Sequence, residues 1–143
     1  MTKEELAKTL NQALELEHAA RIQYLAHAEQ ATTPAVIARL KEIADDEKNH
    51  EDVFRGLIGG YLDAVPSMGM AETHTAKTER EILEVNLDDE KHAVDVYMGI
   101  LDKMREMKED LKYEYLQLEH GVRHVIQDEE DHISELKLLL ERG

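Results

Sequence analysis

The sequence contains no cysteine and no tryptophan, and only two prolines and seven glycines among 143 residues. Without cysteine there are no disulfides, thiolate zinc sites, iron–sulfur clusters or cysteine nucleophiles, so a bound metal must be held by carboxylate oxygens and imidazole nitrogens. Scarce proline and glycine, together with abundant Ala, Leu, Glu and Lys, favour helix over sheet or disorder. The length predicts one domain, residues 1–143, with a single core.

Basic residues are also few, because 17 Lys and Arg stand against 32 Asp and Glu, a formal net charge of −15. Such a charge repels nucleic-acid phosphates and anionic membranes and attracts cations, so we expect neither nucleic acid nor a membrane as a partner. The sequence has no apolar run near the roughly 18 residues of a membrane span, and no signal-peptide core at its start. We therefore expect a cytoplasmic protein.

Apolar residues recur every three or four positions over four long segments, the pattern of amphipathic helices. The first helix is predicted from about Leu6 to the sequence Thr32-Thr33-Pro34. There, a threonine N-cap followed by a proline at the first helical position predicts the start of the second helix. Gly59-Gly60 is expected to end that helix.

The stretch from Tyr61 to about Thr75 has no sustained period and predicts a long connection. Thr78 and Glu81 have the spacing of a capping box at the start of the third helix. The fourth helix is predicted from about Asp110, with Asp110 as its N-cap. Together these segments predict an all-α, antiparallel four-helix bundle with one long crossover between the second and third helices.

A carboxylate interrupts the apolar face of each predicted helix. These four residues are Glu17, Glu47, Glu90 and Glu129. On the second and fourth helices a histidine follows three positions later, which places both side chains on one face. On the first and third helices a tyrosine follows seven positions later. The histidines are His50 and His132, and the tyrosines are Tyr24 and Tyr97.

The spacing of the glutamates predicts that they meet. In an antiparallel hairpin, two residues lie at the same level when the turn falls midway between them. The midpoint of Glu17 and Glu47 is residue 32, inside the first predicted turn, and that of Glu90 and Glu129 falls within residues 108–110. Both hairpins therefore bring their glutamates to one level.

Four carboxylates in an apolar core repel one another and are costly to desolvate unless they are protonated or neutralised. Two divalent cations offset four negative charges, and carboxylate with imidazole ligands suits iron, with manganese as the other choice. Any one of these glutamates is more simply read as solvent-exposed. The joint alignment of six groups favours a dinuclear metal site.

The segment 17–28 resembles the first ligand helix of bacterioferritins, and the segment 128–133 resembles their last. One Glu from each of two helices with Glu-x-x-His from the other two is the di-iron carboxylate pattern of such bundles. The sequence thus resembles the ferritin-like superfamily, especially bacterioferritins and the helical domain of rubrerythrins. The resemblance implies that Glu17 and Glu90 are terminal ligands and that Glu47 and Glu129 bridge the two irons. It also implies that His50 and His132 each bind one iron, and that Tyr24 and Tyr97 orient the ligands.

Three departures from these families refine the prediction. Lys48 stands where bacterioferritins have a haem-binding methionine, so no haem is expected. Ala93 replaces an extra rubrerythrin carboxylate, and the cysteine-containing domain of rubrerythrins is missing. No fifth helix follows Leu140, which argues against a 24-subunit cage. A homodimer or a higher homo-oligomer is expected.

The predicted function is oxidation of Fe(II) by dioxygen or hydrogen peroxide at a di-iron site, serving iron handling or protection from oxidative stress. One alternative keeps the site but makes the protein a rubrerythrin-like peroxidase that takes electrons from a donor protein. Another alternative is a metal-free helical interaction protein. Elsewhere, His120 and His124 lie one helical turn apart, but the polar neighbours Gln117, Gln127 and Asp131 favour a solvated face over a metal site.

Overall fold

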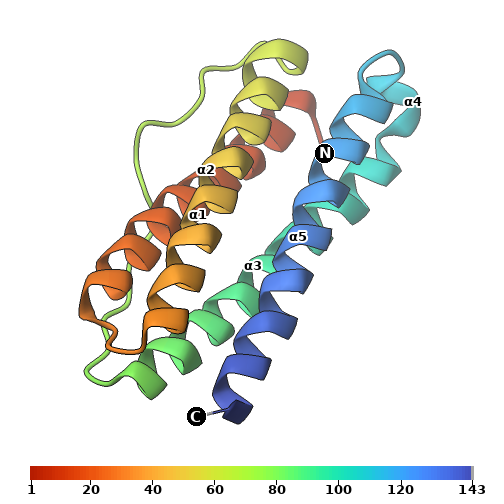
Figure 1. Ribbon diagram of the computed structural model, residues 1–143. Helices are drawn as coiled ribbons and strands as arrows, with labels where there is room; N and C mark the ends of the chain where they lie inside the picture. Colours follow the sequence, from red (N-terminus) through yellow and green to blue (C-terminus); the bar gives the residue numbers. More distant parts are fainter. Residues whose placement is uncertain (143) are drawn as a thin grey trace.

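The computed structural model describes residues 1–142 as a bundle of four long helices and one short one (Figure 1). The helices are α1 (Lys3–Gln30), α2 (Pro34–Tyr61), α3 (Glu79–Glu106), α4 (Lys108–Leu111) and α5 (Tyr115–Arg142). Helices α1 and α2 form one antiparallel hairpin and α3 and α5 form another, and the hairpins meet through α1–α3 and α2–α5 contacts. The predicted four-helix bundle with its long crossover is confirmed. No helix in the described part is long and apolar enough to cross a membrane.

The first hairpin turns where the sequence predicts, and a glutamate of the third helix binds its turn. Pro34 is the first residue of α2, as expected. Thr33 occupies the N-cap position, as predicted, but its side chain makes no capping hydrogen bond to the helix. Instead, Glu79 at the start of α3 accepts hydrogen bonds from the backbone N–H groups of Thr32 and Thr33, at 3.0 and 2.8 Å, and from the Thr33 hydroxyl. The Glu79 carboxylate thus ties the α1–α2 turn to the start of the third helix.

Two other predicted helix ends are nearly right. The Thr78 hydroxyl accepts from the N–H of Glu81 at 3.1 Å, as a capping residue should. The Glu81 carboxylate accepts from the N–H of Lys77 rather than that of Thr78, so only half of the capping box forms. Helix α2 continues through Gly59-Gly60 and ends at Tyr61.

The predicted start of the fourth helix is wrong. Asp110 lies inside the short helix α4 and is not an N-cap; α5 begins at Tyr115. The chain between them passes through Lys112, whose φ of 43° breaks the helical path. The reason is packing, since Met107 and Leu111 are buried in the core and hold α4 against the end of the bundle.

The core consists of two apolar clusters, one toward each end of the bundle. One includes Leu10, Phe54 and Leu118, and the other includes Ile43 and Ile82. The interrupting glutamates lie between these clusters along every long helix. The fold therefore places a polar layer inside an apolar interior, at the level where the hairpins meet.

The crossover between α2 and α3 runs back along α1 and is fastened to it by side-chain hydrogen bonds (Figure 1). Asn11 donates to the carbonyl of Val65 and accepts from the N–H of Ser67, at 3.0 and 2.7 Å. Further along, Gln23 accepts from the N–H of His74 at 2.6 Å. The crossover is therefore held in place beside the polar layer.

Gly121 allows a close approach of α5 to α2. A Cβ at Gly121 would lie 2.9 Å from Leu57 Cδ1, whereas a Cβ at the exposed Gly99 in α3 meets nothing within 4 Å. We expect Gly121→Ala to destabilise the protein by about 1–3 kcal/mol through overpacking. Gly99→Ala should stabilise it by about 0.5–1 kcal/mol, because alanine favours helix. Urea unfolding measures both, and equal stabilisation by the two variants would contradict the close contact.

Candidate metal centre

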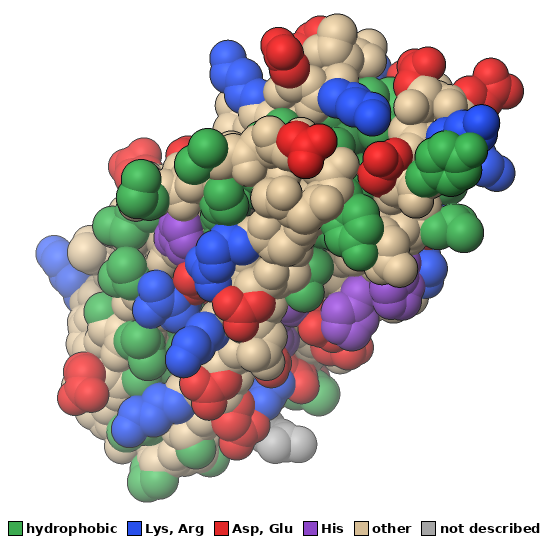
Figure 2. All heavy atoms as spheres, turned by 90° about the horizontal axis from the view of Figure 1, so that it is seen from above, with side chains coloured by type: hydrophobic (Ala, Val, Ile, Leu, Met, Phe, Trp, Pro, Cys, Tyr) green, Lys and Arg blue, Asp and Glu red, His purple; other side chains and the backbone are tan. Residues whose placement is uncertain are grey.

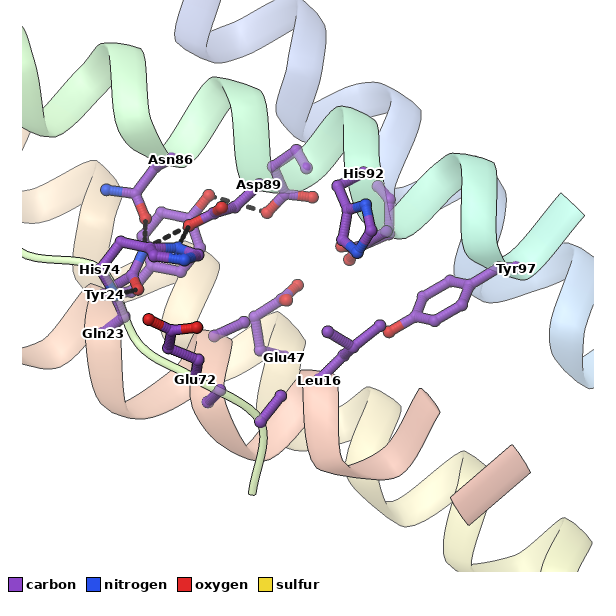
Figure 3. Close-up of a pocket in the computed structure, with 16 residues that line it drawn as sticks. Leu16, Gln23, Tyr24, Glu47, Glu72, His74, Asn86, Asp89, His92 and Tyr97 are labelled. Atoms are coloured by element: carbon purple, nitrogen blue, oxygen red, sulfur yellow. Dashed lines mark hydrogen bonds and ion pairs between the residues drawn. The ribbon is translucent and has the colours of Figure 1, made fainter. Parts of the chain in front are cut away.

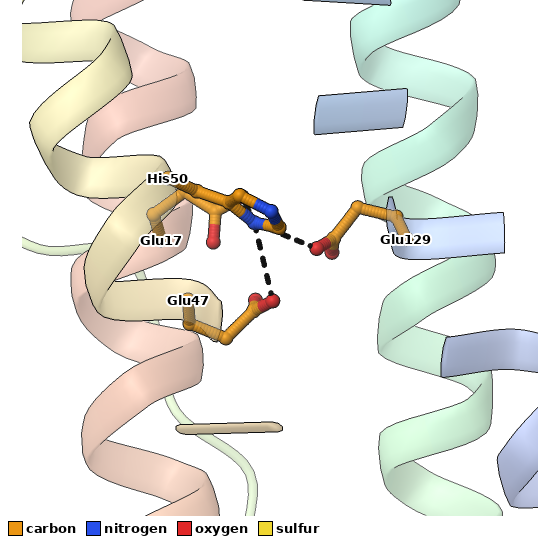
Figure 4. A group of neighbouring side chains, drawn as sticks. All are labelled: Glu17, Glu47, His50 and Glu129. Atoms are coloured by element: carbon orange, nitrogen blue, oxygen red, sulfur yellow. Dashed lines mark ion pairs between the residues drawn. The ribbon is translucent and has the colours of Figure 1, made fainter. Parts of the chain in front are cut away.

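Six side chains converge in the polar layer, and each is only 1–3% exposed. They are Glu17, Glu47, His50, Glu90, Glu129 and His132. Their donor atoms form two groups, each within 4.8 Å, and the groups share Glu47 and Glu129. Figure 4 shows the group that these two glutamates form with Glu17 and His50. Glu17 and His50 complete one group, and Glu90 and His132 complete the other. Two overlapping groups with two shared carboxylates form a buried cluster suited to a dinuclear metal site.

Each of these six residues has one buried oxygen or nitrogen atom without a hydrogen-bond partner. The atoms are Glu17 Oε2, Glu47 Oε1, His50 Nδ1, Glu90 Oε2, Glu129 Oε1 and His132 Nδ1. His50 Nδ1 lies 3.0 Å from Glu129 Oε1, and His132 Nδ1 lies 3.3 Å from Glu47 Oε1, without the alignment of a hydrogen bond. Buried polar atoms left unpaired are costly. Cation ligation removes that cost, so the donor set fits a pair of metal ions.

Burial shifts the proton affinity of the cluster. It raises the pKa of Glu17 to about 7, with the Glu129 carboxylate adding to the effect. Burial and the neighbouring carboxylates of Glu17 and Glu90 also raise the pKa of Glu47 to about 7. For His50, burial lowers the pKa, but surrounding carboxylates, led by that of Glu129, raise it overall well above its usual range. Protons therefore neutralise part of the cluster when no metal does.

Two aspartates orient the histidines, and neither was singled out by the sequence analysis. His50 Nε2 donates to Asp128 at 2.8 Å, and His132 Nε2 donates to Asp46 at 2.9 Å. With Nε2 occupied in this way, Nδ1 of each ring faces the cluster, as in the carboxylate–histidine–metal arrangement. The sequence pattern that could have revealed them is Asp-Glu-x-x-His, which occurs in both α2 and α5.

The two predicted tyrosines bind carboxylates on the opposite hairpin. Tyr24 of α1 donates to Glu90 Oε1 at 2.7 Å, and Tyr97 of α3 donates to Glu17 Oε1 at 3.1 Å. In both glutamates Oε1 is therefore engaged, while Oε2 is the unpartnered atom. The hydroxyls fix each carboxylate with one oxygen turned toward the cluster.

A cavity of about 270 Å³ reaches the cluster from the side of α1 and α3 (Figure 3). Glu47, Glu90 and Glu129 line its inner end. Glu72 and His74 of the crossover border it as well. The cluster is therefore enclosed by helices on most sides and approached through a narrow space beside the crossover.

Comparison with known proteins agrees with this geometry. The profile of the ferritin-like domain matches residues 5–125. No curated protein matches the chain. Several solved structures are similar to this chain at 22–23% sequence identity, and this similarity shows that they share its fold.

Three solved structures are similar over nearly the whole chain. A Rhodobacter capsulatus bacterioferritin, described with a metal-free dinuclear site and haem iron, has a TM-score of 0.85 and 23% identity, covering 96% of this chain and 84% of its own. A ferritin-like, diiron-carboxylate protein from Bacillus anthracis has a TM-score of 0.87 and 23% identity, and the match covers 98% of this chain and 99% of that one. A bacterioferritin-related protein from Bacteroides fragilis, described as a dodecameric thioferritin, has a TM-score of 0.83 and 22% identity, and the match covers 99% of this chain and 88% of that one.

The orienting role of the aspartates predicts their effect on metal affinity. Asp46→Asn and Asp128→Asn should each weaken Mn²⁺ binding about 10–100-fold, because the histidine loses its anionic partner. Asp45→Asn is the matched control, since Asp45 is exposed and adjacent to Asp46. Isothermal titration calorimetry measures the three affinities. The same affinity in all three variants would contradict the proposed orienting role.

The raised carboxyl pKa values predict that metal binding releases protons. Below about pH 7, Glu17 and Glu47 take up protons with which a metal must compete, so affinity should fall as the pH decreases from 7.5 to 6. Above pH 7 Glu17 and Glu47 are ionised and the dependence should weaken, while the histidines, whose pKa values neighbouring carboxylates raise, still release protons to the metal. Mn²⁺ titration across this range, in buffers of different ionisation enthalpy, measures both affinity and proton release. A pH-independent affinity is the opposing result.

Proposed function

Because the chain belongs to the ferritin-like domain family, we propose that its buried cluster holds two iron ions and that the protein oxidises Fe(II) with dioxygen or hydrogen peroxide. One observation carries this proposal, namely the six unpartnered donor atoms that face one another in an otherwise apolar core. Their oxygen and imidazole chemistry suits iron, and manganese is the other metal that it suits.

Each ion has a complementary set of protein ligands in this proposal. Glu17 and His50 hold one ion, Glu90 and His132 hold the other, and Glu47 and Glu129 lie between them. Two divalent charges then balance four carboxylates, which removes the repulsion that burial imposes on the metal-free cluster.

Two adjacent Fe(II) ions supply two electrons together, which with two protons reduce dioxygen to hydrogen peroxide or hydrogen peroxide to two water molecules. The protein contributes position and enclosure. Tyr24 and Tyr97 fix the outer carboxylates, while Asp46 and Asp128 fix the imidazoles. The apolar clusters on both sides of the layer limit the access of water to the site.

The cavity beside α1 supports a route for a small oxidant (Figure 3). Ala19, Ala20 and Ala93 line it, and their small side chains leave open the space that reaches Glu47 and Glu90. Its volume of about 270 Å³ is ample for dioxygen or hydrogen peroxide.

Anaerobic titration with Fe(II) tests the proposal. The wild-type protein should bind two Fe(II) ions per chain at the cluster, beyond any ion held at the protein surface, while Glu47→Ala should bind these two far more weakly because it removes a carboxylate shared by both groups. Glu130→Ala is the matched control, since Glu130 lies on α5 beside Glu129 but is exposed. A stoichiometry near zero, or identical binding by Glu47→Ala and wild type, would reject the site.

The loaded protein can then be mixed with each oxidant in a stopped-flow instrument. Reaction with dioxygen or with both oxidants is expected of the proposed Fe(II) oxidation. A large preference for hydrogen peroxide would favour the alternative, a rubrerythrin-like peroxidase supplied by an electron-donor protein. Protein that is purified without chelator and carries no metal would instead favour a helical interaction protein.

We also propose that the protein forms a homodimer or a higher homo-oligomer. Support comes from the similar Bacteroides fragilis protein, which is described as dodecameric.

A further inference from the structure

Outside the buried cluster, two histidines stand together on the surface of α5. The rings of His120 and His124 are stacked, with centroids 6.2 Å apart and planes inclined by 21°. Both side chains are exposed, and both line a groove of about 300 Å³ between α2 and α5. Figure 2 shows histidine side chains gathered on the molecular surface beside acidic ones. This pair belongs to a different cavity from the one that reaches the cluster.

Acidic groups lie on two sides of the histidine pair. Asp128 follows one helical turn after His124, and its Oδ2 lies 3.6 Å from His124 Nε2. Asp52 of α2 also lines the groove. Residues spaced by four lie on one face of a helix, so His120, His124 and Asp128 form a row of three metal-ligating side chains.

We propose that His120 and His124, with the carboxylate of Asp128, form a second, surface site for a divalent transition-metal ion. Imidazole nitrogen is a preferred ligand of Zn²⁺, Ni²⁺, Cu²⁺ and iron. The protein's net charge of −15 draws such cations to its surface. The surface site shares Asp128 with the buried cluster, because the same Oδ2 accepts a hydrogen bond from His50 Nε2, whereas His120 and His124 belong to the surface site alone.

The surface side chains must rotate to enclose an ion, unlike the preformed buried cluster. His120 is free to do so, since its side chain is exposed and its hydrogen bond from Arg123 is long, at 3.4 Å. In the sequence alone, the polar neighbours of the pair favour a solvated face. The structure adds the stacked rings, the groove and the contact of His124 with Asp128.

Retention on an immobilised Ni²⁺–iminodiacetate resin tests the surface site, because the resin cannot reach ligands that are 1–3% exposed. The untagged wild-type protein should be retained. His120→Ala and His124→Ala should each weaken retention at least about tenfold in apparent affinity, since two linked ligands bind far better than one. His92→Ala is the control, because His92 is an exposed histidine on α3. Circular dichroism verifies that each variant is folded.

A Co²⁺ titration gives the stoichiometry in solution. Wild type should bind one more ion per chain than the double variant His120→Ala/His124→Ala, and loss of the buried ions would leave that difference unchanged. The failure of this site is therefore distinguishable from failure of the proposed function. Equal stoichiometry in the two proteins, or retention that resembles that of His92→Ala in both single variants, would overturn the proposal.

Discussion

Charge compensation in the interior is the constraint on which this structure depends. Four carboxylates and two imidazoles occupy the middle of an apolar bundle, and each carries an atom that no protein group satisfies. Burial of unpaired charges opposes folding, so the cluster must hold protons or cations. The raised pKa values of Glu17 and Glu47 mean that these carboxylates bind protons readily. The convergence of the donor atoms suits the binding of cations.

The hydrogen bonds that surround the cluster also join the two hairpins to each other. Four side-chain hydrogen bonds surround the cluster, and each joins a residue of the α1–α2 hairpin to one of the α3–α5 hairpin. The pairs are Tyr24 with Glu90, Tyr97 with Glu17, His50 with Asp128, and His132 with Asp46. Each hairpin contributes one tyrosine, one histidine and one aspartate, so the two halves hold each other's cluster residues in position. Each half of the sequence has a glutamate followed by a tyrosine seven positions later and then Glu-x-x-His, and this shared pattern gives the site an approximate two-fold symmetry.

The two sides of the bundle differ in how they present the cluster. On the α1 and α3 side, the crossover is fastened along α1 and borders the cavity that reaches Glu47 and Glu90. On the α2 and α5 side, Asp128 links the buried His50 to the exposed His124. Asp128 thus contacts both the proposed di-iron site and the proposed surface site.

The sequence by itself determined the four long helices, the long crossover and the six residues that meet, because apolar periodicity and the spacing of residues about a turn are local properties of the chain. It did not determine the pairing of the histidines with Asp46 and Asp128, the start of α5 at Tyr115, or the hydrogen bonds of Glu79 to the first turn. Each of these joins residues that are distant in sequence or depends on burial of a turn against the core. Only the docking of one hairpin on the other decides such contacts. Before the hairpins pack, many polar residues along a helix are equally able to make them.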